Sequence, residues 1–549
     1  MAQELPDVSP DRRNGPTPLS WAIMGGHEEV VKMILERDDI DANIADGHGQ
    51  TPLFVAAWKG HEEVVKMLLR RNDVYPDTRT EFGETPLFPA ICEGREGVLK
   101  ILLQRTDVNP NTVNDYGQTP LFRAAWEGPE EAVKMLLERA DIKASTVDRH
   151  SQSPLLVAAS RGHEGVVKML LKREDVKANT INAWGQSPLS EASLKGHEGV
   201  VKMLLETQDV NPNTPDSIGQ TSLSIAAGKG HEGVVRMLLN RADINASPIS
   251  KWGQSPLSLA LWNGHEGVAK MLLEREDVNP NIADALGQTP LFIAAEKGLV
   301  RVVQMLLGRA EVNPNAADNN GKTPLSQATW EGHEEVVKML LEREDIDASA
   351  MDKCGQTPLS EAACRGHERV VKMLLERVDV NFNTVDENGQ SPLSMAAWGG
   401  HEGVVKMLLE RVDIEPNITN KKGLTPLFIA AYEGHEGVVK ILLDRNDVNP
   451  NLADSIGQRP LFIAAQNGHE GVVKIFLERA DVNVDMNNRE GRRTLSLALD
   501  RGHHAIVELL SEHRNFIPTS DGNGITTLSP PQIQISAPPK GSSGSDVQN

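Results

Sequence analysis

The sequence has few cysteines, few aromatic residues and no long apolar run. Three cysteines in 549 residues exclude a secreted fold held together by disulfides. No stretch approaches the roughly 18 apolar residues of a membrane-spanning helix. The first residues, MAQELPDVSPDRR, lack the apolar core of a signal peptide. We therefore expect an intracellular protein without membrane contact, most simply cytoplasmic, with the nucleus as the alternative.

The composition is otherwise that of an ordinary globular chain, with 39% hydrophobic residues and a formal net charge of -21. A length of 549 residues alone would suggest three or four domains. The acidic balance argues against nucleic acid as the main partner, because phosphate recognition depends on basic side chains.

An internal repeat replaces the estimate of three or four domains. The tripeptide Thr/Ser-Pro-Leu, or a close variant, recurs every 34 residues without insertion or deletion. We count columns from its first residue as column 0; Leu at column 2, Ala at column 5 and Gly at column 9 occur in every copy. The fifteen copies begin at Thr17, Thr51, Thr85, Thr119, Ser153, Ser187, Thr221, Ser255, Thr289, Thr323, Thr357, Ser391, Thr425, Arg459 and Arg493.

The repeat divides the chain into three parts. Residues 1–16 form a lead-in that is partly a repeat turn, and residues 17–516 form the array. Residues 517–549 are rich in Pro, Ser and Gly and lack the period, which predicts a disordered tail.

Each copy predicts two helices and a turn. Thr or Ser followed by Pro is typical of a helix N-cap and first helical residue, and Gly at column 9 is typical of a left-handed helix end. Columns 13, 14, 17 and 18 carry apolar residues at helical spacing, which predicts a second helix. The segment Asp284–Gly287 suits a type I turn. One copy cannot bury its apolar face alone, so stacked copies must form a solenoid.

TPLFVAAWKGHEEVVKMLL at 51–69 resembles the ankyrin repeat, whose pattern begins T-P-L-H-x-A. The resemblance covers all fifteen copies. It implies an all-α, superhelical ankyrin solenoid of helix-turn-helix repeats with turn or hairpin fingers. We also expect the protein to be a monomer. The period here is 34 rather than the usual ~33. Column 3 carries Ser, Phe or Leu in place of the family's His, and the second helix lacks the Gly that usually ends it.

The amino-acid sequence of the copies, GHEGVVKMLLER above all, also resembles that of the ankyrin arrays of large fungal NOD-like proteins of the NACHT/STAND type. That resemblance implies an alternative function: the chain would be the ligand-sensing arm of a larger signalling ATPase whose catalytic domain lies outside it. A passive spacer is a third alternative.

The sequence predicts no catalytic, cofactor-binding or metal-binding residue, and we expect no enzyme. Twelve of the 16 histidines occupy column 10, one repeat apart, which is too far for a shared zinc ligand set, so we expect a structural role. NNGKT at 319–323 imitates a phosphate-binding loop but lacks its first glycine. Cys354 and Cys364 are too few to form a metal site. A catalytic set should occur once, whereas the polar residues here recur in every copy.

Four variable columns are the candidate binding surface: 7 and 8 at the end of the first helix, and 30 and 31 at the turn. We call them the recognition columns; the ankyrin resemblance places them on the concave groove. Ten of the 21 aromatic residues lie in columns 7 and 31, as expected of protein-interface anchors. The predicted partner-binding residues are Trp58, Trp126, Trp262, Trp330, Trp398, Tyr432, Phe82, Tyr116, Trp184 and Trp252.

The sequence thus predicts a non-enzymatic scaffold that binds one or more proteins through this groove. The recognition columns contain 13 Lys or Arg and 10 Asp or Glu, so the acidity belongs mainly to the scaffold. They show no sustained basic stripe, which again disfavours nucleic acid. The six Phe of column 3 (Phe54, Phe88, Phe122, Phe292, Phe428, Phe462) alternate with Ser and are assigned neither to the core nor to the groove.

Overall fold

The computed structural model describes residues 15–484, 489 and 492–513, and these residues form 30 helices in 15 consecutive pairs. Regular structure in these ranges is helical throughout. The lead-in before residue 15 and the predicted tail lie outside the described residues. The chain divides into two compact units, residues 1–421 and 422–549.

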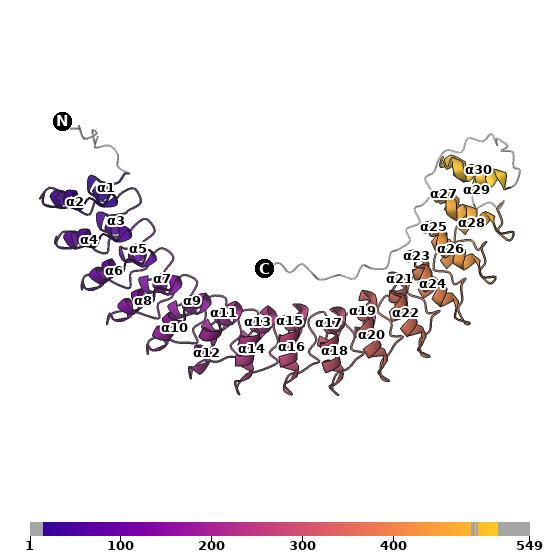
Figure 1. The fold of residues 1–549 in the computed structure, drawn as a ribbon, viewed down its shortest axis with the longest axis horizontal. Helices are drawn as coiled ribbons and strands as arrows, with labels where there is room; N and C mark the ends of the chain where they lie inside the picture. The colour runs from indigo at the N-terminus through magenta and orange to yellow at the C-terminus, as the bar shows by residue number, and fades with distance from the viewer. Residues whose placement is uncertain (1–14, 485–488, 490–491, 514–549) are drawn as a thin grey trace. The chain divides into compact units, whose positions relative to one another are not determined.

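The first unit contains twelve helix pairs stacked in chain order (Figure 1). The first helices of its pairs are α1 (Pro18–Met24), α3 (Pro52–Lys59), α5 (Leu87–Cys92), α7 (Pro120–Glu127), α9 (Pro154–Arg161), α11 (Pro188–Lys195), α13 (Ser222–Lys229), α15 (Pro256–Trp262), α17 (Pro290–Glu296), α19 (Pro324–Glu331), α21 (Pro358–Arg365) and α23 (Pro392–Gly399). The second helices are α2 (Glu28–Leu35), α4 (Glu62–Leu69), α6 (Glu96–Leu103), α8 (Glu130–Leu137), α10 (Glu164–Leu171), α12 (Glu198–Glu206), α14 (Glu232–Leu239), α16 (Glu266–Leu273), α18 (Val300–Leu307), α20 (Glu334–Leu341), α22 (Glu368–Leu375) and α24 (Glu402–Leu409).

The second unit contains three pairs built in the same way. They are α25 (Pro426–Glu433) with α26 (Glu436–Leu443), α27 (Pro460–Asn467) with α28 (Glu470–Leu477), and α29 (Thr494–Asp500) with α30 (His504–Glu512). Within each unit a helix packs against its partner in the pair and against the equivalent helix of the next pair. The core is therefore continuous along each stack, as expected of a solenoid.

The first helix begins and ends as the repeat predicts. In α3 the Thr51 hydroxyl accepts a hydrogen bond from the Phe54 amide at 3.2 Å, and Pro52 is the first helical residue. Gly60 ends the helix with φ +82°. All fifteen column 9 glycines have φ between +65° and +92°, a region that costs other residues roughly 1 kcal/mol or more.

Column 3, which the sequence left unassigned, belongs to the core. All six Phe of this column are buried, Phe88 and Phe428 to within 1% of full burial. Where the column carries Ser, the hydroxyl bonds the start of its own helix instead. In α11 the Ser187 amide donates to the Ser190 hydroxyl at 2.8 Å, and the Ser190 amide donates to the Ser187 hydroxyl at 3.1 Å. Phe thus fills volume, whereas Ser completes a capping box in α11, α15 and α21.

The second helix ends without glycine because an arginine at column 20 takes over. Arg377 is an example: its guanidinium pairs with Asp379 at 2.7 Å and donates to the carbonyl oxygen of Leu341, the last residue of α20, at 3.0 Å. One guanidinium thereby holds its own turn and satisfies a helix-end carbonyl of the preceding repeat.

Candidate functional site

The turn that carries columns 30 and 31 is fixed by backbone and side-chain hydrogen bonds. The Gly287 amide donates to the Asp284 carbonyl at 2.9 Å, which confirms the predicted turn. The Asp284 carboxylate also accepts from the Leu286 and Gln288 amides, each at 2.9 Å. The tip residues are therefore presented on a rigid loop.

Successive turn tips are also bonded to one another. In the first unit the column 31 carbonyl accepts from the column 30 amide of the next repeat at all eleven junctions, at 2.8–3.1 Å. For example, the Ser217 amide donates to the Trp184 carbonyl, and the Ala285 amide donates to the Trp252 carbonyl. Side chains at the tips are thereby held in register from repeat to repeat.

The end of the first helix is held in the same way by the column 10 histidine. His367 Nε2 donates to the Trp330 carbonyl oxygen at 3.1 Å, and seven other described histidines make the equivalent bond to the preceding repeat. In one repeat Arg95 replaces His and donates to the Trp58 carbonyl at 3.3 Å. Bonds to a carbonyl give these histidines the structural role expected of them.

The ten predicted binding residues are spread over nine repeats and do not gather into one cluster. The four at the turn tips are well exposed: Phe82 (53%), Tyr116 (60%), Trp184 (48%) and Trp252 (51%). Of the six at helix ends, Trp58 is exposed, whereas Trp126, Trp262, Trp398 and Tyr432 are half-buried. Trp330 is only 6% exposed.

The burial of Trp330 differs from the picture of a free groove side chain. Arg365 of the next repeat covers its ring at 4.0 Å, and the Lys322 ammonium lies 4.8 Å from the ring centre. Two cation–π contacts and the neighbouring helix thus shield the indole. For Trp330 to contact a partner through its ring face, Arg365 would have to move.

A cation of the following repeat also lies over two other tryptophans of column 7. Arg161 is 4.1 Å from the Trp126 ring, and the Lys297 ammonium is 4.9 Å from the Trp262 ring. The cation is in column 8 in each pair, 35 residues after the tryptophan. At the turn tips, the rings of His150 and Trp184 stack at 5.4 Å. The surface is therefore one of aromatic rings held against basic side chains.

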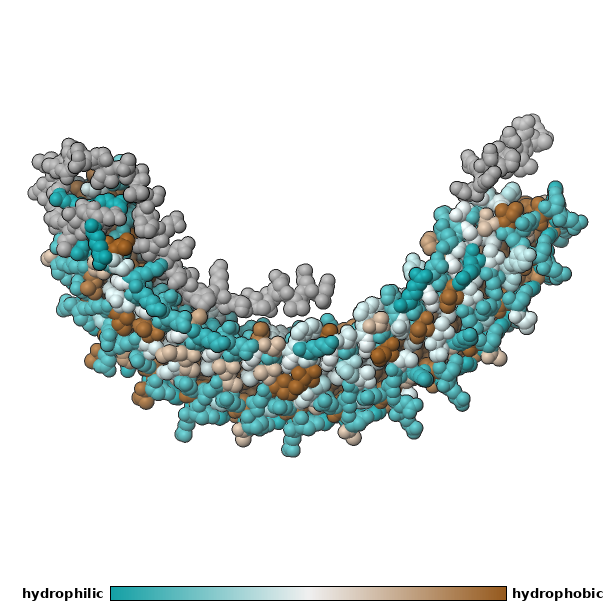
Figure 2. Space-filling view, turned by 180° about the vertical axis from the view of Figure 1, so that it is seen from behind, coloured by the Kyte–Doolittle hydropathy of each residue, from teal (hydrophilic) through white to brown (hydrophobic). Residues whose placement is uncertain are grey.

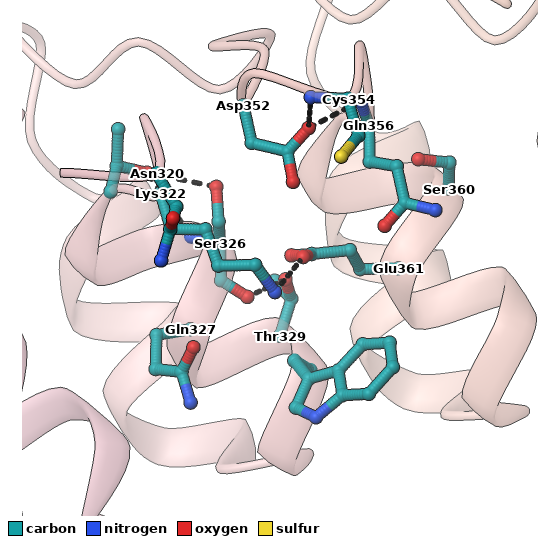
Figure 3. Close-up of polar contacts among 12 residues, drawn as sticks. Asn320, Lys322, Ser326, Gln327, Thr329, Asp352, Cys354, Gln356, Ser360 and Glu361 are labelled. Atoms are coloured by element: carbon teal, nitrogen blue, oxygen red, sulfur yellow. Dashed lines mark hydrogen bonds and ion pairs between the residues drawn. The ribbon is translucent and has the colours of Figure 1, made fainter. Parts of the chain in front are cut away.

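A buried ion pair joins Lys322 to Glu361 (Figure 3). Glu361 in α21 is fully buried at its side chain and accepts a hydrogen bond from the Lys322 ammonium at 2.7 Å through Oε1. Its second oxygen, Oε2, is buried without a hydrogen-bond partner. Burial raises the pKa of Glu361 to about 7, against the opposing effect of the Lys322 charge.

Sequence reasoning missed columns 4 and 33, which provide this pair. Column 4 is apolar in most repeats but carries Arg123, Glu191 and Glu361 in three, and those charges were the available signal. The buried Glu191 accepts a hydrogen bond from the Ser160 hydroxyl at 2.7 Å. Arg123 donates to the Cys92 sulfur at 3.3 Å and pairs with Glu127 at 2.9 Å. These columns meet column 7 of neighbouring repeats.

Cys354 and Cys364 have different surroundings. Cys354 is exposed at a turn tip and Cys364 is buried in α21. Burial raises the pKa of the Cys364 thiol to about 11, so it stays protonated at neutral pH. Within the described ranges, no three His, Cys, Asp or Glu side chains are placed to hold a metal ion.

Exposed hydrophobic side chains form small separate patches on an otherwise hydrophilic face (Figure 2). None of the helices in the described part of the chain is both long and apolar enough to cross a membrane.

The comparison with family models decides the family. The model for ankyrin repeats, which spans three copies, matches residues 2–79, 71–148, 142–216, 208–284, 276–352, 344–420 and 412–486. The chain belongs to the ankyrin-repeat family. Ankyrin repeats serve in general as protein-interaction modules. No curated protein matches the chain. The family match does not bear on the narrower resemblance to fungal NOD-like arrays, which stays a prediction.

Proposed function

We propose that this ankyrin-repeat protein is a non-catalytic scaffold that binds one or more protein partners through its recognition columns. The observation that carries the proposal is the exposure of large aromatic side chains on rigid turn tips. Trp184 and Trp252 leave about half of their surface in solvent while their backbones are bonded to the next repeat. Exposed, pre-ordered aromatic rings contribute strongly to protein interfaces because little side-chain entropy is lost on binding.

The electrostatics support binding rather than chemistry. The buried carboxylates Glu361 and Glu191 each bond a neighbouring repeat, Glu361 to Lys322 and Glu191 to Ser160, and column 4 carries such a charge in only a few repeats. Interaction surfaces vary in this way because each repeat contacts a different part of the partner. The proposal includes an intracellular location and a monomeric state.

The test removes the exposed rings without disturbing the core. The double variant Trp184→Ala, Trp252→Ala is compared with Tyr75→Ala, which removes an exposed ring (67%) outside the recognition columns. Proteins retained by the immobilised full chain are quantified for each variant, with thermal unfolding as the folding control. The proposal predicts loss of partners from the double variant alone. Equal retention by all three proteins would contradict it.

A further inference from the structure

The charges of the recognition columns are segregated along the first unit. From Met24 to Glu127 these columns carry four acids (Glu81, Glu93, Asp115, Glu127) and one cation, Lys59. From residue 149 to residue 297 they carry one acid, Glu296, and six cations. The cations are Arg149, Arg161, Lys195, Lys229, Lys251 and Lys297. We call the stretch from 149 to 297 the basic sector.

The basic sector is a continuous surface. Arg161, Lys195 and Lys229 occupy the same position at the ends of α9, α11 and α13, which pack side by side (Figure 1). All six cations are exposed, and exposed Trp184 and Trp252 lie on the turn tips among them. Its one acid, Glu296, lies 3.5 Å from Lys297, so its charge is already neutralised.

The fold does not require these cations. Within the described ranges no carboxylate forms an ion pair with Arg149, Arg161, Lys195, Lys229 or Lys251. The scaffold arginines of column 20 behave differently, since Arg139, Arg173 and Arg241 in the same repeats each pair with an aspartate.

Position at a helix end does not explain the basic sector either. Column 8 lies at the C-terminal end of the first helix, where a cation is mildly favourable. The same column nevertheless carries Glu93, Glu127 and Glu331 in other repeats. Arg149 and Lys251 are on turn tips, outside any helix. Arg149, Lys195, Lys229 and Lys251 are therefore available to a ligand, whereas Arg161 also lies against the Trp126 ring at 4.1 Å.

We propose that the basic sector binds an acidic, extended peptide segment of a partner protein. This inference rests on the proposed function and names the partner's chemistry. Packed helices lie about 8–10 Å apart, and an extended peptide rises about 3.3 Å per residue. A carboxylate at every third residue would therefore face Arg161, Lys195 and Lys229 in turn, with apolar residues between them against Trp184 and Trp252.

The surroundings favour an acidic peptide over nucleic acid. The chain carries a net charge of -21, and four acids of the recognition columns precede the basic sector. A polynucleotide strand that continued from residue 149 toward the N-terminal repeats would be repelled by these acids. An acidic segment of a protein can instead end where the basic sector ends. The basic sector is limited in length and follows a stretch of recognition columns that carries four acids. This arrangement matches a peptide whose own charge changes along its length.

The experiment uses the full chain and a fluorescent 15-residue probe, (Glu-Leu-Ser)₅, with (Lys-Leu-Ser)₅ and a 15-nucleotide single-stranded RNA as competitors for the same surface. The test variant is Lys195→Glu, Lys229→Glu. The matched control is Lys168→Glu, Lys202→Glu, which makes the same charge change on exposed second-helix lysines of two adjacent repeats of the basic sector, those that begin at Ser153 and Ser187. Fluorescence anisotropy gives Kd, and thermal unfolding confirms that each variant is folded.

The inference predicts that the acidic probe binds the native chain and the control alike. The test variant should bind it about tenfold more weakly, because two attractive pairs become repulsive. No binding of the acidic probe, equal weakening in the control, or tighter binding of the RNA would overturn the inference. Self-association of the native chain in sedimentation experiments, if the test variant lost it, would also overturn the inference. If natural partners are lost with Trp184→Ala, Trp252→Ala but kept by the test variant, the proposed function stands and this inference fails.

Discussion

The Nε2 atom of His367 lies 3.1 Å from the main-chain carbonyl oxygen of Trp330, one repeat earlier. The carbonyl can only accept, so this nitrogen carries a hydrogen. The bond satisfies a carbonyl at the end of α19, which has no partner within its own helix. It also fixes the backbone of a recognition-column residue, so the same histidine stabilises the stack and orients the binding surface.

Replacement of His367 by Leu should destabilise the array by roughly 1–2 kcal/mol, because the carbonyl loses its donor. The control is His27→Leu, since α1 and α2 form the first described pair and His27 has no described repeat before it. Amide hydrogen exchange should show faster opening around α19 to α22 in the first variant only. Unchanged exchange there would contradict the role given to column 10.

The column 9 glycine is required for two separable reasons. A Cβ on Gly128 would lie 2.5 Å from the His163 ring, and its φ is +92°. A Cβ on Gly94 would meet nothing within 4 Å, and its φ is +65°. Gly94→Ala should therefore cost about 1 kcal/mol of backbone strain alone, and Gly128→Ala clearly more. Urea unfolding of the two variants gives the difference, and equal costs would show that the histidine contact is unimportant.

Thr207 occupies column 20. In twelve other repeats this column carries an arginine that forms an ion pair with the acidic residue two positions later. Asp209 follows it at the usual distance. Thr207→Arg should raise stability by about 0.5–1 kcal/mol, because it restores a forked ion pair and a donor to the preceding helix. Thr207→Lys is the control, since an ammonium lacks the planar fork. The thermal midpoints should rise in the order Thr, Lys, Arg; a midpoint for Arg no higher than for Lys would contradict the account.

The pKa of Glu361, raised to about 7 in the folded chain, links stability to pH. The folded state holds this proton more tightly than the unfolded state. The stabilising contribution is complete below the unfolded pKa near 4.5 and is lost as pH rises through about 7. Relative to Glu361→Gln, the native chain should therefore lose stability between those pH values, by on the order of 2–3 kcal/mol.

Thermal midpoints from pH 4 to pH 9 would test this linkage. The Lys322→Gln variant provides the second measurement. It removes the charge that lowers the pKa of Glu361, so the loss should move to higher pH. Parallel curves for the native chain and Glu361→Gln would show that the carboxyl titrates normally.

Much of the repeat structure was predictable from the sequence because the interactions that determine it lie within one copy. The cap at Thr51, the left-handed Gly60 and the turn closed by Gly287 depend on residues a few positions apart. The burial of Trp330 was not predictable in this way, because Arg365 and Lys322, the residues that cover it, belong to neighbouring repeats. The role of the column 20 arginine was missed for the same reason, since Arg377 makes two bonds to Asp379 in its own turn and a third to Leu341 of the preceding copy.

Site-specific photo-cross-linking from the intact chain to its bound partner tests directly whether partners bind through the recognition columns. A photoreactive phenylalanine would replace Trp184 or Trp252 on the recognition columns, and Lys168 or Lys202 on the second helices. If partners bind through the recognition columns, cross-links should form from the first two positions and not from the other two. Cross-links confined to Lys168 and Lys202 would show that partners bind the opposite face, and would contradict the account.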